Sequence, residues 1–116
     1  MVGVTRGEVW LTDLDPTRGS EQQGIRPCLV ISNNVSNEFA PTACVLPLTS
    51  NLSGTKFPIN VLLKTAESGL KVDSLVLVGQ IRTIAKERLL RKLSEIDTAK
   101  ILEVETALKI YLDIRH

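Results

Sequence analysis

Five short segments of the chain have the hydrophobic pattern of β-strands, and its last part has the pattern of a helix. Apolar and polar residues alternate over residues 8–14, and apolar residues run almost without interruption over 27–32 and 43–48, as in strands buried on both faces. Residues 59–63 and 74–81 complete the predicted β-structure. After Asp97, a suitable helix N-cap, apolar residues recur every three or four positions, at Ile101, Val104, Leu108 and Tyr111.

The segments between the predicted strands are longer than tight hairpins require. Residues 15–25, 33–42, 49–58 and 64–73 each form a connection of roughly ten residues, and loops of that length often carry function. Pro47 predicts an edge, a bulge or a strand end within its segment, and a short helical stretch is expected over 86–91. Several strands followed by a terminal helix predict an α+β fold with a curled sheet or small barrel.

The size and composition of the chain set limits on this fold. A length of 116 residues predicts one domain spanning 1–116, and 43% hydrophobic and 23% charged residues are typical of a globular protein. The first residues lack the apolar region of a signal peptide, and no apolar run approaches the ~20 residues that span a bilayer. We therefore expect a cytoplasmic protein.

The cysteine and histidine content gives no indication of a metal or other cofactor. Cys28 and Cys44 lie in apolar runs, which predicts buried free thiols in a reducing compartment. A disulfide between neighbouring strands is the alternative. The single histidine is His116, and no pair of residues has the spacing of zinc ligands.

Positive charge is unevenly distributed although the net charge is only +1. Ten of the 14 Lys and Arg residues lie in 59–116, and five of them, Arg82, Lys86, Arg88, Arg91 and Lys92, fall within 82–92. The run has two interpretations. It could be one solvated helix face, or a patch that contacts phosphates or an acidic partner.

The segment 19–27 carries the densest chemistry of the chain. It places Ser20, Glu21, two glutamines (Gln22 and Gln23) and Arg26 between two predicted strands, and the proline after Arg26 favours extended geometry there. The hydroxyl residues Thr49 and Ser50 follow the next buried strand. Gln80 and Arg82, two positions apart, are expected on one side of one strand, after a Gly79 that predicts a bulge or a close backbone approach. Taken singly, these elements are also consistent with polar turns and turn capping.

Together and in this order, the motifs resemble the MazF/PemK toxins of type II toxin–antitoxin systems. The matching stretches are Gly-Glu-Val-Trp at 7–10, Asp-Leu-Asp-Pro at 13–16, Gly-Ser-Glu-Gln-Gln-Gly-Ile-Arg-Pro at 19–27, Pro-Leu-Thr-Ser at 47–50 and Gln-Ile-Arg-Thr-Ile at 80–84. The chain departs from many relatives at Ala85, where an Asp often follows. The resemblance implies an SH3-like barrel of the kind shared with CcdB toxins, cleavage of single-stranded RNA at short specific sequences, a homodimer, and an antitoxin whose acidic tail covers the RNA-binding groove.

The same resemblance implies a site built on Arg26, Thr49 and Glu21. RNA can be cleaved by its own 2′-hydroxyl, so a catalytic metal is not obligatory. Arg26 would stabilise the charge on phosphorus, and the family likeness also gives it a part in proton transfer, which its high pKa makes awkward. Glu21 is the more natural base, although a nearby Arg26 would oppose the pKa increase that this role requires. Thr49 would donate to a phosphate oxygen.

Further residues are expected to contact the RNA. They are Ser20, Gln22, Gln23, Ser50, Phe57, Gln80 and Arg82. Only 3% of the residues are aromatic; Trp10 and Tyr111 fit the core, whereas Phe39 and Phe57 lie in predicted loops where they could stack on bases.

Three other functions compete with this interpretation. A gyrase-binding toxin of the CcdB type would have the same fold without catalysis, but the C-terminal Trp-Gly-Ile on which that class depends is absent. An RNA-binding module that has lost activity is the second. A peptide-binding SH3-like domain is the third, and it would require an aromatic-lined groove for which this chain has little material.

Overall fold

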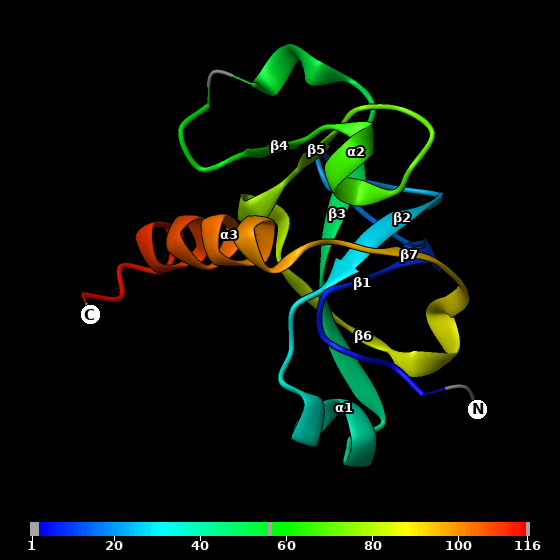
Figure 1. The fold of residues 1–116 in the computed structure, drawn as a ribbon. Coiled ribbons are helices and arrows are strands. Elements are labelled where there is room, and N and C mark those ends of the chain that lie inside the picture. The colour runs from blue at the N-terminus through cyan, green and yellow to red at the C-terminus, as the bar shows by residue number, and fades with distance from the viewer. Residues whose placement is uncertain (1–2, 56, 116) are drawn as a thin grey trace.

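Seven antiparallel strands form the framework of the described part of the chain, which is residues 3–55 and 57–115 of the computed structural model (Figure 1). They are β1 (Glu8–Asp13), β2 (Ile25–Val30), β3 (Thr42–Thr49), β4 (Val61–Leu63), β5 (Ser74–Val76), β6 (Arg82–Ala85) and β7 (Leu89–Glu95). The helices are α1 (Asn34–Phe39), α2 (Thr65–Ser68) and α3 (Thr98–Tyr111), and single 3₁₀ turns occupy Leu52–Gly54, Val78–Gln80 and Lys86–Arg88.

The strand order is β4-β5-β3-β2-β1-β7, and β6 pairs with β3 outside this path. The described residues of β4 and β7 do not pair with each other, so the curled sheet is not closed by hydrogen bonds. The predicted α+β class with a curled sheet and a C-terminal helix is confirmed. No helix within the described ranges is long and apolar enough to cross a membrane.

The central strand β3 joins the two parts of the sheet. One of its edges pairs with β2, whereas the other pairs with β6 over residues 42–45 and with β5 over residues 48–49. Pro47 lies where the second edge changes partner, and its carbonyl oxygen accepts a hydrogen bond from the Leu77 amide at 2.9 Å. A proline has no N–H to donate to a ladder, so this changeover is a position that it tolerates.

Apolar residues fill both faces of this sheet, as the uninterrupted apolar runs predict. On one face Cys28 and Val30 pack with Trp10, and on the other Leu29 packs in a larger cluster that includes Val104 of α3. Trp10 is therefore a core residue, as expected.

Helix α3 begins as predicted. The Asp97 carboxylate accepts a hydrogen bond from the Lys100 amide at 3.0 Å, and Ile101 and Val104 face the core. The predicted apolar stripe weakens towards the end of the helix, where Tyr111 is half-exposed. A Cβ at Gly79 would lie 3.4 Å from the Tyr111 ring, an ordinary van der Waals distance, so the contacts there do not require a glycine.

Three sequence-based expectations about secondary structure are wrong. Residues 74–81 do not form one strand, because the chain leaves the sheet after Val76 and makes a 3₁₀ turn before β6. The helix expected over 86–91 is one 3₁₀ turn followed by the edge strand β7. All residues of β7 are exposed or half-buried, so β7 lacks the apolar pattern of a strand. Residues 33–42 and 64–73, expected to form loops, contain α1 and α2. The N-cap of α1, Asn33, accepts a hydrogen bond from the Ser36 amide.

The basic run 82–92 does not form one helix face. Lys86 is buried and donates to the carbonyl of Asn37 near the end of α1. Lys92 forms ion pairs with Glu8 at 3.1 Å and with Glu95 at 2.6 Å. These two cations therefore bind other parts of the protein, and the interpretation of the run as one solvated helix face is wrong, because the run spans β6, a 3₁₀ turn and β7.

Candidate RNA-cleavage site

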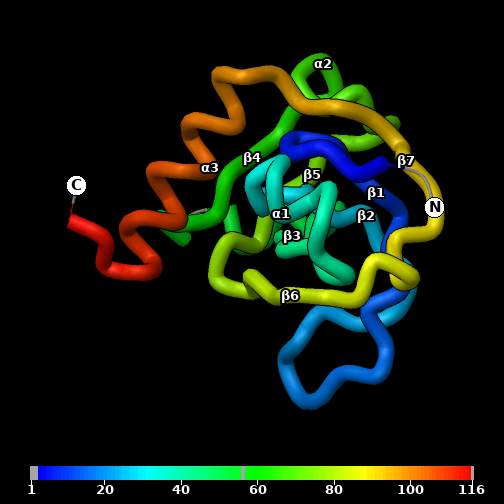
Figure 2. Tube along the Cα trace, turned by 90° about the horizontal axis from the view of Figure 1, so that it is seen from below, coloured from blue at the N-terminus to red at the C-terminus, as the bar shows by residue number. Residues whose placement is uncertain are grey.

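The loop between β1 and β2 projects from the molecule beside β6 (Figure 2). Its base is closed by the Leu14 amide, which donates to the Gly24 carbonyl at 3.0 Å, and by the Gly24 amide, which donates to Asp15 Oδ1 at 3.1 Å. Gly19 and Gly24 have φ values of 57° and 79°, a conformation that glycine adopts without strain. The two glycines of the segment 19–27 thus shape the loop that carries its polar residues.

Gln80 fastens this loop to the rest of the protein. Its Oε1 accepts a hydrogen bond from the Gln22 amide at 2.7 Å, and its Nε2 donates to the Ser20 carbonyl at 3.3 Å. Arg82 Nη1 donates to the Leu14 carbonyl at 3.2 Å, and Arg88 Nη1 donates to the carbonyls of Asp13, at 3.1 Å, and Asp15. Side chains from 80–88 therefore fix a loop about sixty or more residues earlier in the chain.

Arg26 and Thr49 lie in one cavity of about 550 Å³. The register that pairs Cys28 with Pro47 places Arg26 across from Thr49 two residues further along the same two strands. Facing residues of an antiparallel pair point to the same side of the sheet. The sheet itself thus brings together two residues that are 23 positions apart in the sequence.

Hydrogen bonds to the backbone orient both of these side chains. Arg26 Nε donates to the Gln23 carbonyl at 2.6 Å, and no described residue accepts a hydrogen bond from its two Nη groups. Thr49 Oγ1 accepts from the Asn51 amide at 3.1 Å, which leaves its own O–H to donate elsewhere. Gln23 and Ser50 line the same cavity. The arrangement supplies several hydrogen-bond donors that could stabilise an anionic group.

Glu21 is separate from this pair. It lines a neighbouring cavity of about 360 Å³ together with Ser20, Gln22, Gln80 and Arg82. Its carboxylate is exposed and accepts a hydrogen bond from the Arg18 amide at 2.6 Å. Among the described residues, no ion pair within 4.0 Å joins Glu21 to Arg26.

Gln80 and Arg82 line one cavity, but not for the predicted reason. They do not alternate along one strand, because Gln80 ends a 3₁₀ turn and Arg82 begins β6. Phe57 is 57% exposed in the loop after β3 and lines neither of the two cavities. Phe39 ends α1, at the opposite end of the molecule from α2 (Figure 1).

The sequence motifs missed one wall of the Arg26 cavity. This part of the lining consists of Leu70, Lys71 and Val72, from the turn between α2 and β5, and Ser74, the first residue of β5. The only available signal was the length of the connection over 64–73.

A protonated thiol lies close to the site. Burial raises the pKa of Cys28 to about 11, although a hydrogen bond with Thr12 and the positive charges of Arg82 and Arg26 act in the opposite direction. Burial also raises the pKa of Cys44, against a hydrogen bond with Thr83. Both cysteines are free, so the alternative of a disulfide is not realised. Within the described ranges, no three His, Cys, Asp or Glu residues are grouped so that they could hold a metal ion.

Comparison with known proteins decides the family. The profile of the "PemK-like, MazF-like toxin of type II toxin-antitoxin system" matches residues 5–112. The chain belongs to this family.

Curated relatives support this PemK/MazF assignment over almost the whole chain. Endoribonuclease EndoA of Bacillus subtilis is 43% identical over 94% of each chain, and endoribonuclease MazF of Staphylococcus epidermidis is 39% identical over 97% of this chain and 94% of its own. The resemblance stated from the motifs is thereby confirmed.

Solved structures of PemK/MazF toxins share the fold. MazF of Deinococcus radiodurans superposes with a TM-score of 0.85 at 27% identity and covers 98% of this chain and 100% of its own. An endoribonuclease from a mycobacterial species, solved in complex with its cognate antitoxin, gives a TM-score of 0.78 at 25% identity over 100% and 99% of the two chains.

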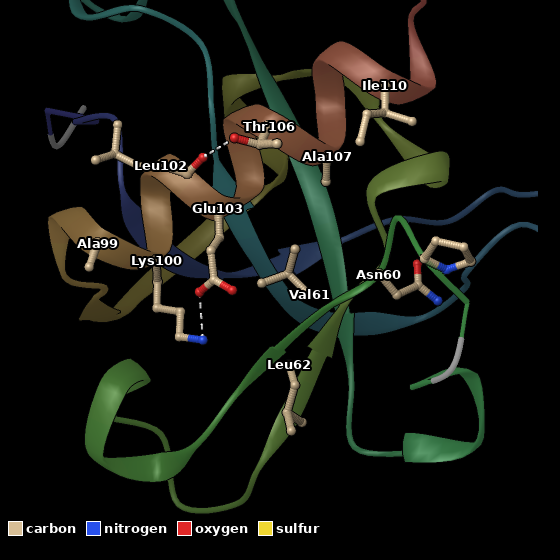
Figure 3. Close-up of a pocket in the computed structure, with 11 residues that line it drawn as sticks. Asn60, Val61, Leu62, Ala99, Lys100, Leu102, Glu103, Thr106, Ala107 and Ile110 are labelled. Atoms are coloured by element: carbon tan, nitrogen blue, oxygen red, sulfur yellow. Dashed lines mark hydrogen bonds and ion pairs between the residues drawn. The ribbon is translucent and has the colours of Figure 1, made fainter.

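A third cavity of this PemK/MazF-family chain lies away from the Arg26 site, between β4 and the outer face of α3 (Figure 3). It measures about 470 Å³, and its lining includes Val61 and Leu62 from β4 and Leu102, Ala107 and Ile110 from α3. Leu102 and Ile110 are more than half exposed. The helix therefore buries one apolar stripe in the core and presents a second one outward.

Proposed function

We propose that this chain is a sequence-specific endoribonuclease toxin that cleaves single-stranded RNA without a metal ion. The observation that carries the proposal is the pairing of Arg26 and Thr49 in one cavity, in a chain whose relatives are named endoribonucleases. No relative named above is a gyrase-binding toxin, so the CcdB-like alternative has no support from them. An enzyme that cuts mRNA would act in the cytoplasm.

The proposed reaction is attack by the RNA's own 2′-hydroxyl. The 2′-oxygen bonds to phosphorus as it loses its proton, the bond from phosphorus to the 5′-oxygen breaks, and the leaving oxygen gains a proton. The products are a 2′,3′-cyclic phosphate and a 5′-hydroxyl. Arg26 would stabilise the charge that grows on the phosphate oxygens, and Thr49 would donate a hydrogen bond to one of them.

Glu21 is the proposed acceptor of the 2′ proton. Because Glu21 and Arg26 line different cavities, this role requires an RNA that spans both of them. Catalytic contacts often tighten only when substrate is bound, so the separation in the free protein is compatible with the assignment. A Glu21→Gln variant that keeps wild-type kcat would remove this residue from the mechanism.

The remaining proposed RNA contacts follow the two cavities. Gln23 and Ser50 would act beside the scissile phosphate, whereas Ser20, Gln22 and Arg82 would act in the Glu21 cavity. Gln80 is engaged with the loop at both ends of its amide, so a direct base contact would require that it release the loop. Phe57 would stack on a base outside the two cavities, which its exposure permits.

The experiment is incubation of a long single-stranded RNA with purified protein in excess EDTA. The proposal expects discrete fragments with 2′,3′-cyclic phosphate and 5′-hydroxyl ends. Arg26→Ala should reduce kcat by about a hundred- to a thousand-fold, the usual cost of one preorganised donor, and Thr49→Val should also reduce it. Arg91→Ala removes an exposed arginine from β7, outside both cavities, and is the control. Intact RNA, or equal rates for Arg26→Ala and the control, would refute the proposal.

An antitoxin of the MazE type is the proposed protein partner. Related toxins have been solved with cognate antitoxins, among them MazE–MazF of Deinococcus radiodurans at 26% identity and a TM-score of 0.80. An acidic antitoxin segment would bind the Arg26 cavity, where the two Nη groups have no acceptor among the described residues. Arg26→Ala should therefore weaken binding of the cognate antitoxin, and Arg91→Ala should not.

The outer face of α3 is the proposed homodimer contact. Leu102, Ile110, Leu112 and Ile114 are 47–64% exposed along the helix and just beyond it. Leu102 and Ile110 also line the cavity of Figure 3. Exposed apolar residues grouped in this way often mark an interface. Ile110→Glu should convert a dimer into a monomer in light scattering, whereas Val35→Glu, at an exposed apolar residue of α1, should not. A monomeric wild type would refute the assembly.

A further inference from the structure

The turn between α2 and β5 brings a lysine to the Arg26 cavity that no motif includes. Lys71 lies at the tip of this turn, and it lines the cavity together with Leu70 and Val72. Residues 25–27 and 48–50 supply the other walls. A segment from a different part of the sequence thus completes the cavity.

Local bonds hold this turn in place. The Thr65 amide donates to Asp73 Oδ1 at 3.0 Å, and the Leu70 amide donates to Ser68 Oγ at 3.0 Å. Gly69 ends α2 with a φ of 71°, and Leu70 packs against the main hydrophobic core. The turn is therefore anchored on both sides of its exposed tip.

The charge of the cavity is positive. Arg26 and Lys71 are the two charged residues among its described lining, and no carboxylate lines it. Lys71 forms no ion pair within 4.0 Å with any described acidic residue. Every nucleotide of an RNA strand carries a phosphate, so a strand with its scissile phosphate at Arg26 brings a second phosphate into the same region. An ammonium group is a strong phosphate ligand.

Two exposed aliphatic side chains flank the same cavity. Ile25 is 59% exposed and Val72 is 54% exposed, and both contribute to its walls. Apolar groups of this kind can cover the face of an unstacked base or its ribose, while a nearby cation neutralises the backbone.

We infer that Lys71 and Val72 form a binding subsite for the nucleotide next to the scissile phosphate. Lys71 binds the backbone phosphate of that nucleotide, and Val72 with Ile25 holds its nucleoside. The inference rests on the endoribonuclease function proposed above. It assigns Lys71 to substrate binding and leaves the bond-breaking step to Arg26 and Thr49.

The test compares Lys71→Gln with Lys64→Gln, which removes the same charge from an exposed lysine just before α2 and outside the cavity. The substrate is a short RNA containing a cleavage sequence mapped with the wild type. For binding, the attacking nucleotide is replaced by its 2′-deoxy form, which cannot be cut. Kd is measured from 50 to 200 mM salt, and KM and kcat are measured on the cleavable RNA.

Loss of one phosphate contact should reduce the slope of log Kd against log salt by about 0.7, the value for single strands. We expect Lys71→Gln to weaken Kd about three- to tenfold at low salt and to raise KM while kcat changes less than about twofold. Lys71→Arg should restore the slope, and Lys64→Gln should behave as the wild type. Val72→Ser should weaken Kd without changing the slope.

The outcomes separate the two proposals. A wild type that cuts RNA while Lys71→Gln matches it in Kd and salt slope overturns the subsite alone. Equal losses in Lys71→Gln and Lys64→Gln also overturn it, because the effect would then be one of net charge. A wild type that neither binds nor cuts RNA overturns the endoribonuclease function and the subsite with it.

Discussion

Gln80 offers a direct test of how the β1–β2 loop is held. Its amide forms two hydrogen bonds, to the Gln22 amide and to the Ser20 carbonyl, at 2.7 and 3.3 Å. Gln80→Leu removes both bonds with little change in side-chain size. Gln80→Glu keeps the acceptor for Gln22 and removes only the donor to Ser20. The two variants therefore divide the interaction into its halves.

The magnitude follows from the two bonds. A hydrogen bond contributes about 0.5–1.5 kcal/mol net, so losing both favours the open loop by about 1–3 kcal/mol. Since 1.4 kcal/mol is a factor of ten, the open population of the loop should rise about five- to 150-fold in Gln80→Leu. Gln80→Glu should retain most of the protection of the Gln22 amide, because the glutamate still accepts the shorter of the two hydrogen bonds. Arg82 still binds the Leu14 carbonyl, so the opening should stay local.

The assay is hydrogen exchange at the Gln22 amide, read together with thermal unfolding. Trp10, the single tryptophan, is 4% exposed in the core and reports global unfolding by its fluorescence. We expect faster exchange at Gln22 in Gln80→Leu, a melting temperature within a few degrees of the wild type, and reduced kcat/KM on RNA. Gln23→Leu is the matched control for exchange, because the Gln23 side chain forms no hydrogen bond to a described residue.

Unchanged protection of the Gln22 amide in Gln80→Leu would contradict this prediction, since the two bonds would then contribute nothing to loop closure. A melting temperature that falls as steeply as in a core variant would contradict it as well. Gln80 would then support the whole fold and not one loop.

Three further predictions concern the framework. Burial raises the pKa of Glu8, but hydrogen bonds from Trp10, Thr5 and Lys92 outweigh it and hold the pKa below its ordinary value of 4.5. Glu8 should therefore stabilise the fold above about pH 4.5 and lose this effect as pH falls through the lowered pKa. In urea titrations at pH 3 to 7, Glu8→Gln should abolish this pH dependence of the unfolding free energy. Asp97→Ala should cost about 0.5–2 kcal/mol of unfolding free energy through the lost N-cap, measured by urea denaturation with Glu38→Ala, at an exposed carboxylate of α1, as control. Cys28 should react with iodoacetamide only on unfolding, because it is fully buried with a pKa raised to about 11; modification of the native protein at pH 8 would contradict this.

Strand pairing explains which parts of the fold the sequence predicts. β2 and β3 are buried on both faces, so their apolar runs were visible without any partner. β7 lies at the edge of the sheet, and its exposed residues include Arg91 and Lys92. In the sequence these residues belong to a charged run that lacks the apolar pattern of a strand. Residues 74–81 have the composition of one strand, but β3 changes its pairing partner here. β5 ends at Val76, a 3₁₀ turn follows over Val78–Gln80, and β6 begins only at Arg82.

The site also contains residues whose grouping the sequence predicts and residues that only the folded chain brings together. The register of β2 and β3 brings Arg26 and Thr49 together, whereas the sequence groups these two residues only through the family resemblance. The separation of Glu21 from Arg26 was not predictable, because it depends on bonds from Gln80 and Arg82 to a loop 58 to 68 residues earlier. The cation at Lys71 was missed for a similar reason, since only the folded turn between α2 and β5 brings it to the cavity.

The β1–β2 loop contributes walls to both the Arg26 cavity and the Glu21 cavity, so the same loop would take part in selecting the RNA sequence. Ser20 and Gln22 face one cavity, whereas Gln23 and Arg26 face the other. An RNA that occupies both cavities must contact residues from one continuous segment. Arg26 is oriented by this segment, because its Nε donates to the Gln23 carbonyl at 2.6 Å. A base that fits poorly beside Gln22 would therefore also disturb the backbone that orients Arg26. In this arrangement the residues that would recognise the base and the residue that would stabilise the phosphate lie on the same short stretch of backbone. A sequence preference expressed in kcat, and not only in KM, is therefore what the loop predicts.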